Sequence, residues 1–160
     1  MPEHETPAEI HFYSTQGEYG CFSNFSRHSI FLGGKRWPTS EHYFQAQKFV
    51  GTEHEETVRN CKTPSLAANL GRSRKLPLRR DWEPVKDRIM LEAVRAKFTQ
   101  HDDLKALLLS TDSAKLVERT ANDSYWGDGG DGSGQNRLGQ LLMQLRDELR
   151  AEAAKATDKP

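Results

Sequence analysis

Apolar residues recur at the spacing of a helix over much of the second half of the chain. The clearest stripe consists of leucines three and four residues apart, at Leu138, Leu141, Leu142, Leu145 and Leu149. A second stripe has a similar spacing, at Val85, Ile89, Ala93 and Ala96. Because an α-helix turns once in about 3.6 residues, these patterns predict two helices that each turn one face to a core. We expect shorter helices over residues 53–61, 65–70 and 104–108.

The first forty residues follow a different pattern, in which short aromatic or β-branched runs alternate with glycines. Residues 10–14 alternate weakly between apolar and polar and predict a strand. Residues 29–32 and 35–37 flank Gly33-Gly34, a pair that readily takes the dihedral angles of a tight turn. The two flanking segments therefore predict a β-hairpin.

These elements together predict a mainly α fold with a small N-terminal antiparallel β element, of the α+β class. Leu116 and Val117 indicate either a short strand or a turn of helix. A chain of 160 residues suits one compact domain, which we place at residues 10–150. Residues 1–9 are polar with two prolines, and residues 151–160 are charged and rich in alanine, so we expect both to be flexible tails.

The stretch from Trp37 to Phe49 predicts a helix with a polar first turn. Pro38 must precede the helix, and either of the two hydroxyl side chains after it can cap the first amide groups. Glu41 then lies where the helix dipole favours negative charge, and it shares one face with Gln45 and Lys48. Either Glu41 only complements the dipole, or this face presents a carboxylate, an amide and an ammonium among aromatic side chains.

A second unusual segment, residues 122–134, is rich in glycine at Gly127, Gly129, Gly130, Gly132 and Gly134. A calcium loop starting at Asp128 would need an oxygen ligand at its third position and a glutamate at its twelfth, where this chain has glycines. The Gly-Lys-Ser/Thr triplet of a phosphate loop does not occur. With Trp126 and Asp131 beside it, the segment is either a close approach of backbone to a ligand or a structural turn.

Cations gather without any acid in a third segment, at Arg72, Arg74, Lys75, Arg79 and Arg80. Arginine side chains can bind a phosphate through paired hydrogen bonds, although an exposed loop is the more common explanation of such a cluster. Trp82 follows directly, and its indole could either stack on a heterocyclic ring or fill the core.

Composition narrows the possible functions. Acidic and basic residues are equal at 23 each, which argues against a broad nucleic-acid surface but leaves room for a local basic patch. Cys21 and Cys61 form neither a CxxC pair nor a zinc spacing, so we expect separate reduced thiols. The sequence shows no apolar run resembling a signal peptide or a membrane span, which predicts a cytoplasmic protein.

Common catalytic motifs that use a metal or a nucleophile are missing. His42, His54 and His101 do not form a metal-binding set, so we expect no metal site. The chain has no HExxH, no GxSxG and no HxE with PCxxC. Carboxylates remain as candidate catalytic groups, at Glu41, Glu118, Asp123, Asp128 and Asp131.

Five segments of the chain resemble the YbiA-type N-glycosidases of the NADAR superfamily, a name that refers to proposed links with NAD and ADP-ribose. They are Phe12-Tyr13-Ser14, Phe22-Ser23-Asn24-Phe25, Trp37-Pro38-Thr39-Ser40-Glu41-His42-Tyr43-Phe44-Gln45-Ala46-Gln47-Lys48-Phe49, Ala96-Lys97-Phe98, and Tyr125-Trp126-Gly127-Asp128-Gly129 with Asn136-Leu138-Gly139. The resemblance runs from about Ile10 to Leu149 and is most specific in the third segment.

The resemblance implies a mostly helical fold and an enzyme that hydrolyses the N-glycosidic bond of early riboflavin-pathway intermediates, the ribosylamino-pyrimidine phosphates. Ribose 5-phosphate and the free pyrimidine would be the products, and no cofactor would be needed. It implies catalytic roles for Glu41, Trp82 and Asp128, with Asp131 as an alternative to Asp128. The implied substrate-binding residues are Asn24, Lys48, Arg72, Arg79, Trp126 and Gly127.

Carboxylate chemistry fits this reaction, because cleavage passes through an oxocarbenium-like state that an anion stabilises. At a helix start Glu41 should be ionised, although a pocket lined by Trp37, Tyr43 or Trp82 would act in the opposite direction. Lys48, Arg72 or Arg79 would bind the 5′-phosphate.

Two alternatives remain open. A hydrolase of the same superfamily that removes ADP-ribose from guanine would need room for a diphosphate and a groove for nucleic acid, which the balanced charge disfavours. A non-catalytic module that binds ADP-ribose or another nucleotide would keep the cations and the glycines but would not need Glu41.

Overall fold

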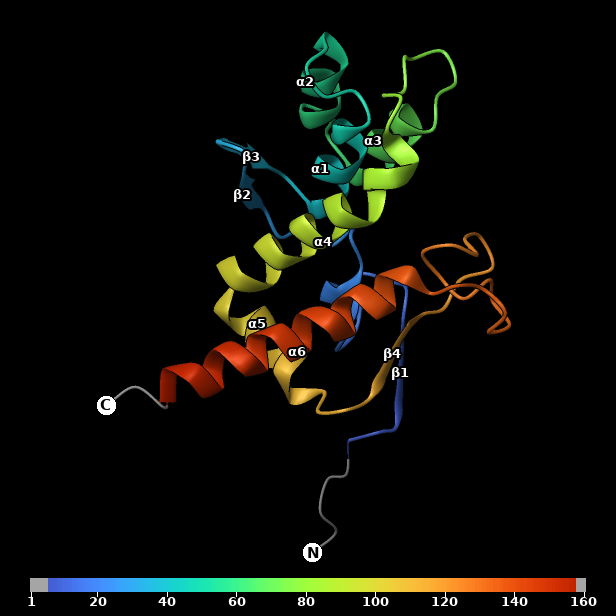
Figure 1. Cartoon of the computed structure of the whole chain (residues 1–160). Helices are drawn as coiled ribbons and strands as arrows, with labels where there is room; N and C mark the ends of the chain where they lie inside the picture. Colours follow the sequence, from blue (N-terminus) through green and yellow to red (C-terminus); the bar gives the residue numbers. More distant parts are fainter. Residues whose placement is uncertain (1–5, 158–160) are drawn as a thin grey trace, which may run out of the picture. The chain divides into compact units, whose positions relative to one another are not determined.

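The computed structural model describes residues 6–157, which are mainly helical with a few short strands, as the sequence predicts (Figure 1). The helices are α1 (Ser40–Gln47), α2 (Glu53–Arg59), α3 (Pro64–Gly71), α4 (Trp82–Gln100), α5 (Asp102–Ser110) and α6 (Arg137–Thr157). The strands are β1 (Glu9–Phe12), β2 (Ile30–Leu32), β3 (Lys35–Trp37) and β4 (Lys115–Glu118), and a short 3₁₀ turn covers Gly20–Phe22. The described residues form two compact units, Thr15–His101 and the remainder, and each is described by itself.

In the unit Thr15–His101, helix α1 packs against α2, α3 and α4. Figure 1 shows α1, α2 and α3 grouped beside the first turns of α4. Strands β2 and β3 form the predicted hairpin, in which Ile30 pairs with Trp37 and Leu32 with Lys35. Gly33 and Gly34 both have positive φ, at 65° and 79°, which a two-residue turn between twisted strands requires. The hairpin leads directly into α1.

The start of α1 confirms the predicted cap and differs from the prediction in its surroundings. The Thr39 side chain accepts a hydrogen bond from the backbone N–H of His42 and so caps the helix. Every residue from Ser40 to Ala46 is buried, including the polar ones. The helix therefore has no solvated polar face, and its polar side chains must find partners inside the protein.

In the other unit, described over residues 6–14 and 102–157, strand β1 lies beside β4. The pairing is parallel, with Ile10 opposite Leu116 and Phe12 opposite Glu118. Strand β1 therefore does not belong to the antiparallel sheet predicted for the N-terminal part of the chain, which among the described residues consists of β2 and β3 alone. Its partner β4 lies about a hundred residues further along the chain. Leu116 and Val117 belong to a strand, which decides between the two predictions for them.

Helix α6 contacts β4 and α5 and buries the predicted leucine stripe. It continues to Thr157, so residues 151–157 of the predicted C-terminal tail are the exposed last turns of this helix. Alanine, glutamate and lysine in that segment are strong helix formers and extend the last turns without burial. Residues 1–5 and 158–160 of the predicted tails lie outside the described residues. No helix in the described part of the chain is long and apolar enough to cross a membrane.

Candidate functional site

Glu41 lies in the first turn of α1 and only 6% of its surface is exposed. Its Oε1 accepts a hydrogen bond of 2.7 Å from Nε2 of Gln45, one turn further along the helix. Its backbone N–H donates to the carbonyl of Asn24 at 3.2 Å. Removing a carboxylate from water is costly unless donors replace the lost hydration, and the Gln45 amide provides part of that replacement. The side chain is thus fixed in one place inside the protein and does not point into bulk water.

Asn24, a predicted substrate-binding residue, is buried and holds the start of α1. Its Oδ1 accepts a hydrogen bond of 2.8 Å from the Ser40 hydroxyl. Its Nδ2 donates to the sulfur of Met90 on α4, at 3.2 Å. Asn24 therefore connects α4, through its own backbone and side chain, with the helical turn that carries Glu41.

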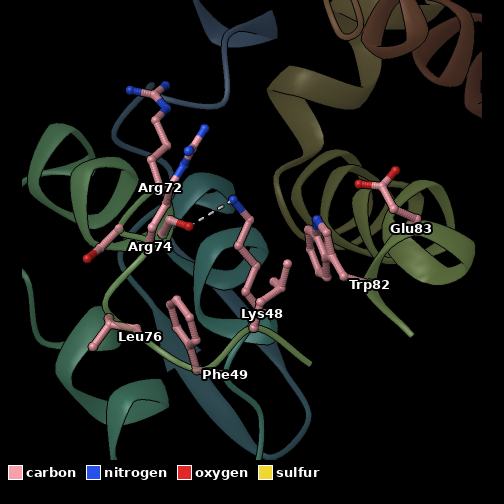
Figure 2. Close-up of a pocket in the computed structure, with 10 residues that line it drawn as sticks. Lys48, Phe49, Arg72, Arg74, Leu76, Trp82 and Glu83 are labelled. Carbon is pink, nitrogen blue, oxygen red and sulfur yellow. Dashed lines mark hydrogen bonds between the residues drawn. The ribbon is translucent and has the colours of Figure 1, made fainter. Parts of the chain in front are cut away.

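A cavity of about 490 Å³ opens in the same unit, beyond the C-terminal end of α1 (Figure 2). Three predicted site residues, Lys48, Arg72 and Trp82, lie in its wall, and Glu41 does not. The remaining wall residues are Phe49, Gly71, Ser73, Arg74, Leu76, Leu78 and Glu83. The cavity thus combines cations with aromatic and aliphatic surface, which suits a ligand with both an anionic group and a ring.

Lys48 links this cavity to Glu41. Its ammonium donates to the carbonyl of Gly71 at 3.1 Å and lies 5.5 Å from the ring of Trp82. Burial lowers the pKa of Lys48, and the negative charge of Glu41 opposes that effect. Since Lys48 comes seven residues after Glu41, the two side chains lie on one face of the helix and act on one another electrostatically.

The cationic groups lie toward one side of the cavity. Figure 2 shows the guanidinium groups of Arg72 and Arg74 on the same side as the Lys48 ammonium, with Trp82 across from them. Arg79, also predicted to bind phosphate, is not in the wall. Both carboxylate oxygens of Asp81 accept hydrogen bonds from its guanidinium, at 2.6 and 2.9 Å. Arg79 therefore already has an anionic partner, while Arg72 and Arg74 face the cavity.

Trp82 is the first residue of α4 and combines both roles considered for it. Its indole is 6% exposed and packs at 5.1 Å from the ring of Phe44, as a core residue would. The same ring lines the cavity and faces the ammonium of Lys48. Core packing thus fixes the indole in an orientation where one part of it remains available to a ligand.

Asp128 belongs to the other unit and organises the glycine-rich loop. Its side chain is 2% exposed, and its Oδ1 accepts hydrogen bonds from the backbone N–H groups of Gly130 at 2.8 Å and Thr120 at 3.0 Å. Arg119 pairs with Oδ2 at 2.6 Å. Burial raises the pKa of Asp128, but the two amide donors and Arg119 outweigh burial and leave that pKa below its ordinary value. Asp131 is exposed and bonds to Ser133.

Gly127 and Trp126, two predicted binding residues, lie in the same loop. A Cβ on Gly127 would meet the Thr120 side chain at 2.6 Å and the backbone oxygens of Asp123 and Glu118 at 2.9 and 3.0 Å, so only glycine fits. Trp126 is half-buried and packs edge-to-face on Tyr125, at 4.8 Å between ring centroids. The loop is therefore tightly packed around its own residues.

Sequence reasoning missed two features of the Glu41 site. His42 is buried and connects Thr39 Oγ1, at 2.8 Å from its Nδ1, with the carbonyl of Cys61, at 2.9 Å from its Nε2. Burial lowers the pKa of His42, so it stays neutral at pH 7. Gly71 ends helix α3, and the lack of a side chain there also allows close contact with Gln45. The contact of His42 with Cys61 and that of Gln45 with Gly71 could not be found by spacing, because each joins residues that are far apart along the chain.

Neither Cys21 nor Cys61 forms a disulfide bond within the described residues. Among residues 6–157 no group of three or more His, Cys, Asp or Glu side chains could hold a metal ion.

The buried Glu41 carboxylate thus lies on the same helix face as Lys48, which lines a cavity with other cations. The model of the NADAR domain matches residues 11–150, and the chain belongs to this family. It is 58% identical to "N-glycosidase YbiA" of Escherichia coli (strain K12) over 143 residues, 89% of each chain. It is 43% identical to "Riboflavin biosynthesis protein PYRR, chloroplastic" of Zea mays over 155 residues, which cover 88% of this chain and 25% of that protein.

A solved structure has the same fold. The NMR structure of the E. coli protein YbiA superposes with a TM-score of 0.87 at 55% sequence identity, and the match covers 96% of this chain and 92% of that one. The resemblance stated from the sequence motifs is therefore confirmed, together with the mainly α fold.

Proposed function

We propose that this chain hydrolyses the N-glycosidic bond of ribosylamino-pyrimidine 5′-phosphates, early riboflavin-pathway intermediates, to ribose 5-phosphate and the free pyrimidine. It is an N-glycosidase, a hydrolase of N-glycosyl bonds, in keeping with relatives at 58% identity that carry that name. The single observation that carries the mechanism is the buried Glu41 carboxylate, on one helix face with the Lys48 ammonium of the cavity wall.

Glu41 supplies the negative charge that the reaction needs. When the bond to nitrogen breaks, positive charge develops on C1′ and the ring oxygen of the ribose, and a nearby carboxylate stabilises it. Inside the protein the effective dielectric is lower than in water, so this attraction is stronger than it would be at the surface. The same carboxylate can accept a proton from the attacking water. The pyrimidine ring delocalises the charge of the leaving amine, which reduces the need for a general acid.

The cavity supplies the binding groups. Arg72, Arg74 and Lys48 bind the 5′-phosphate, because guanidinium and ammonium groups make charge-assisted hydrogen bonds to phosphate oxygens. Trp82 offers to the pyrimidine the part of its indole that lines the cavity. Asp128, by contrast, acts by holding the glycine-rich loop in shape, since its side chain bonds Gly130 in that loop and Arg119 and Thr120 just before it. Trp126 and Gly127 belong to that same loop, in which Gly127 allows the close packing around Thr120.

The substrate is a small phosphorylated N-riboside and not a nucleic acid. A cavity of about 490 Å³ matches a small ligand, and the net charge of zero supports no extended nucleic-acid groove. Two separate free thiols favour a cytoplasmic location.

Glu41→Gln tests the proposal, because it keeps the shape of the side chain and removes its charge. The purified protein is offered the ribosylamino-pyrimidine phosphate and, separately, an oligonucleotide carrying ADP-ribosylated guanine, and ribose 5-phosphate or ADP-ribose is measured. We expect turnover of the first substrate to fall by about 100- to 1,000-fold, the usual cost of removing one electrostatic stabiliser. Substrate should still raise the melting temperature of the variant by mass action.

Glu53→Gln is the matched control. Glu53 is also in the first turn of a helix capped by threonine, but it is exposed. Its loss should leave turnover unchanged. Full turnover by the Glu41 variant would remove Glu41 from the mechanism, and release of ADP-ribose alone would replace the riboflavin intermediate by the other substrate.

A further inference from the structure

The amide group of Gln45 has an orientation that its neighbour dictates. A carboxylate only accepts hydrogen bonds, so the atom of Gln45 that lies 2.7 Å from Glu41 Oε1 must be the donor Nε2. The carbonyl oxygen of the same amide, Oε1, therefore points away from Glu41. Gln45 is 4% exposed, so neither end of the amide is open to bulk solvent.

This carbonyl oxygen is buried without a hydrogen-bond donor among the described residues. A buried polar atom without a partner costs free energy, and a bound ligand group is one of the explanations for such an atom in a native protein. Oε1 lies against Gly71, where it would be 1.9 Å from a Cβ built on that residue. Any side chain on Gly71 would therefore displace the amide.

Gly71 also connects Gln45 with the cavity. It lies in the cavity wall, and its carbonyl accepts the hydrogen bond from Lys48. It is the last residue of α3, and its backbone does not have the positive φ that would by itself require glycine. Because Gly71 has no side chain, the Gln45 amide can pack closely against this part of the cavity wall.

We propose that Gln45 recognises the sugar of the substrate next to the reacting carbon. Its Nε2 orients Glu41, and its Oε1 accepts a hydrogen bond from the 2′-hydroxyl of the bound riboside. This inference rests on the proposed function. Nε2 and Oε1 are bonded to the same carbon, so a hydroxyl that reaches Oε1 on the Gly71 side lies only one amide group away from the Glu41 carboxylate. If Glu41 faces C1′, the neighbouring substituent of the sugar is the 2′-hydroxyl. Hydrogen bonds at this position strengthen as charge develops in glycoside hydrolysis.

The test compares the riboside 5′-phosphate with its 2′-deoxy counterpart in the wild type and in Gln45→Met. The methionine keeps the volume of the side chain and removes both amide atoms. We expect the preference in kcat/KM for the riboside over the deoxyriboside to fall by about 10- to 100-fold in the variant, the usual effect of one hydrogen bond to a polar group in a buried site. Because preferences are compared between proteins, the different intrinsic reactivities of the two sugars cancel.

Two further variants separate recognition from orientation of Glu41. Gln45→Glu keeps an acceptor and loses the donor, so it should retain the preference while kcat falls on both substrates. Gly71→Ala leaves the amide intact but pushes it aside, so it should lose the preference as Gln45→Met does. Gln47→Met is the matched control, since Gln47 lies on the same helix, is half-buried and does not line the cavity. Melting temperatures verify that each variant is folded.

The outcomes decide the inference and the proposed function separately. A wild-type preference that survives unchanged in both Gln45→Met and Gly71→Ala overturns the role of Oε1 while the glycosidase function stands. Equal losses on both sugars reduce Gln45 to orienting Glu41 and also overturn the recognition role. A wild-type protein that consumes neither riboside overturns the proposed function itself.

Discussion

Two buried carboxylates, Glu41 and Asp128, are stabilised in opposite ways. Asp128 is bonded by backbone amides and an arginine that all lie within nine residues of it along the chain. The carboxylate of Glu41 is held by Gln45, four residues along the helix, but the position of both depends on distant segments. The backbone N–H of Glu41 donates to the carbonyl of Asn24, and Gln45 packs against Gly71. Local contacts build the loop, and long-range contacts build the Glu41 site.

This difference bears on which of the two carboxylates can contact a ligand without loss of its present hydrogen bonds. Oδ1 of Asp128 accepts two backbone hydrogen bonds and Oδ2 forms an ion pair with Arg119, so a ligand could bind this carboxylate only by displacing those groups. Glu41 is held by a neighbouring side chain next to a cation-lined cavity, with an unused acceptor beside it. Backbone amides close to it in the chain hold Asp128, whereas a side chain holds Glu41, and this difference supports the catalytic role proposed for Glu41.

The largest effect on stability should come from Gly127→Ala, which tests whether the loop is structural. The added methyl group would overlap the Thr120 side chain and two backbone oxygens that cannot move independently. Overpacking of this kind costs about 1–3 kcal/mol, and backbone neighbours favour the upper end of that range. Chemical denaturation of the variant and of Ser124→Ala, an exposed control in the same loop, measures the loss.

The same variant tests whether the glycine-rich loop takes part in the reaction. If Gly127→Ala keeps its stability and loses turnover, the loop takes part in the reaction and the contrast with Glu41 is wrong. If stability falls and the folded fraction still turns over substrate, the loop is scaffold.

The same contrast explains what could be predicted from sequence. The cap at Thr39, the Gly33-Gly34 hairpin and the leucine stripe of α6 depend on neighbours within a few residues, and each prediction is confirmed. The grouping of Glu41, Gln45 and Lys48 on one face also follows from helical spacing alone.

The missed features depend on contacts between distant segments. The pairing of β1 with β4 joins residues about a hundred positions apart, and no local pattern distinguishes a parallel from an antiparallel partner. That Arg74 faces the cavity while Arg79 pairs with Asp81 depends on how the segment after α3 runs past α1. Gly71 and Gln45 meet only because α1 and α3 pack together.

Lys97 gives the second prediction, on the support behind Glu41. It is 1% exposed, and its ammonium donates to the carbonyl of Ser23 at 2.8 Å, one residue before Asn24. Burial lowers the pKa of Lys97 to about 7. Between pH 7 and the ordinary lysine pKa the unfolded chain binds a proton that the folded protein has lost, so stability should rise with pH in this window.

The rise approaches about 1.4 kcal/mol per pH unit well above pH 7 and is absent below it. Lys97→Met should lack this pH-dependent part, so the difference in unfolding free energy between the two proteins should change steadily from pH 7 to pH 9.5. Urea titrations at each pH measure it. A constant difference would mean that the lysine is not buried behind the Glu41 site in solution.

The smallest expected effect concerns the arginines that long-range packing brings to the cavity, and it sharpens the assignment of the phosphate. Arg72→Met or Arg74→Met should raise KM for the 5′-phosphorylated riboside by about fivefold to tenfold, since each exposed guanidinium contributes one charge-assisted contact. The dephosphorylated riboside should bind both variants as it binds the wild type. Arg80→Met, from the same cationic segment but outside the cavity wall, is the control. An equal loss on both substrates would show that these arginines shape the cavity and do not read the phosphate, and the anionic group would then have to be bound by Lys48.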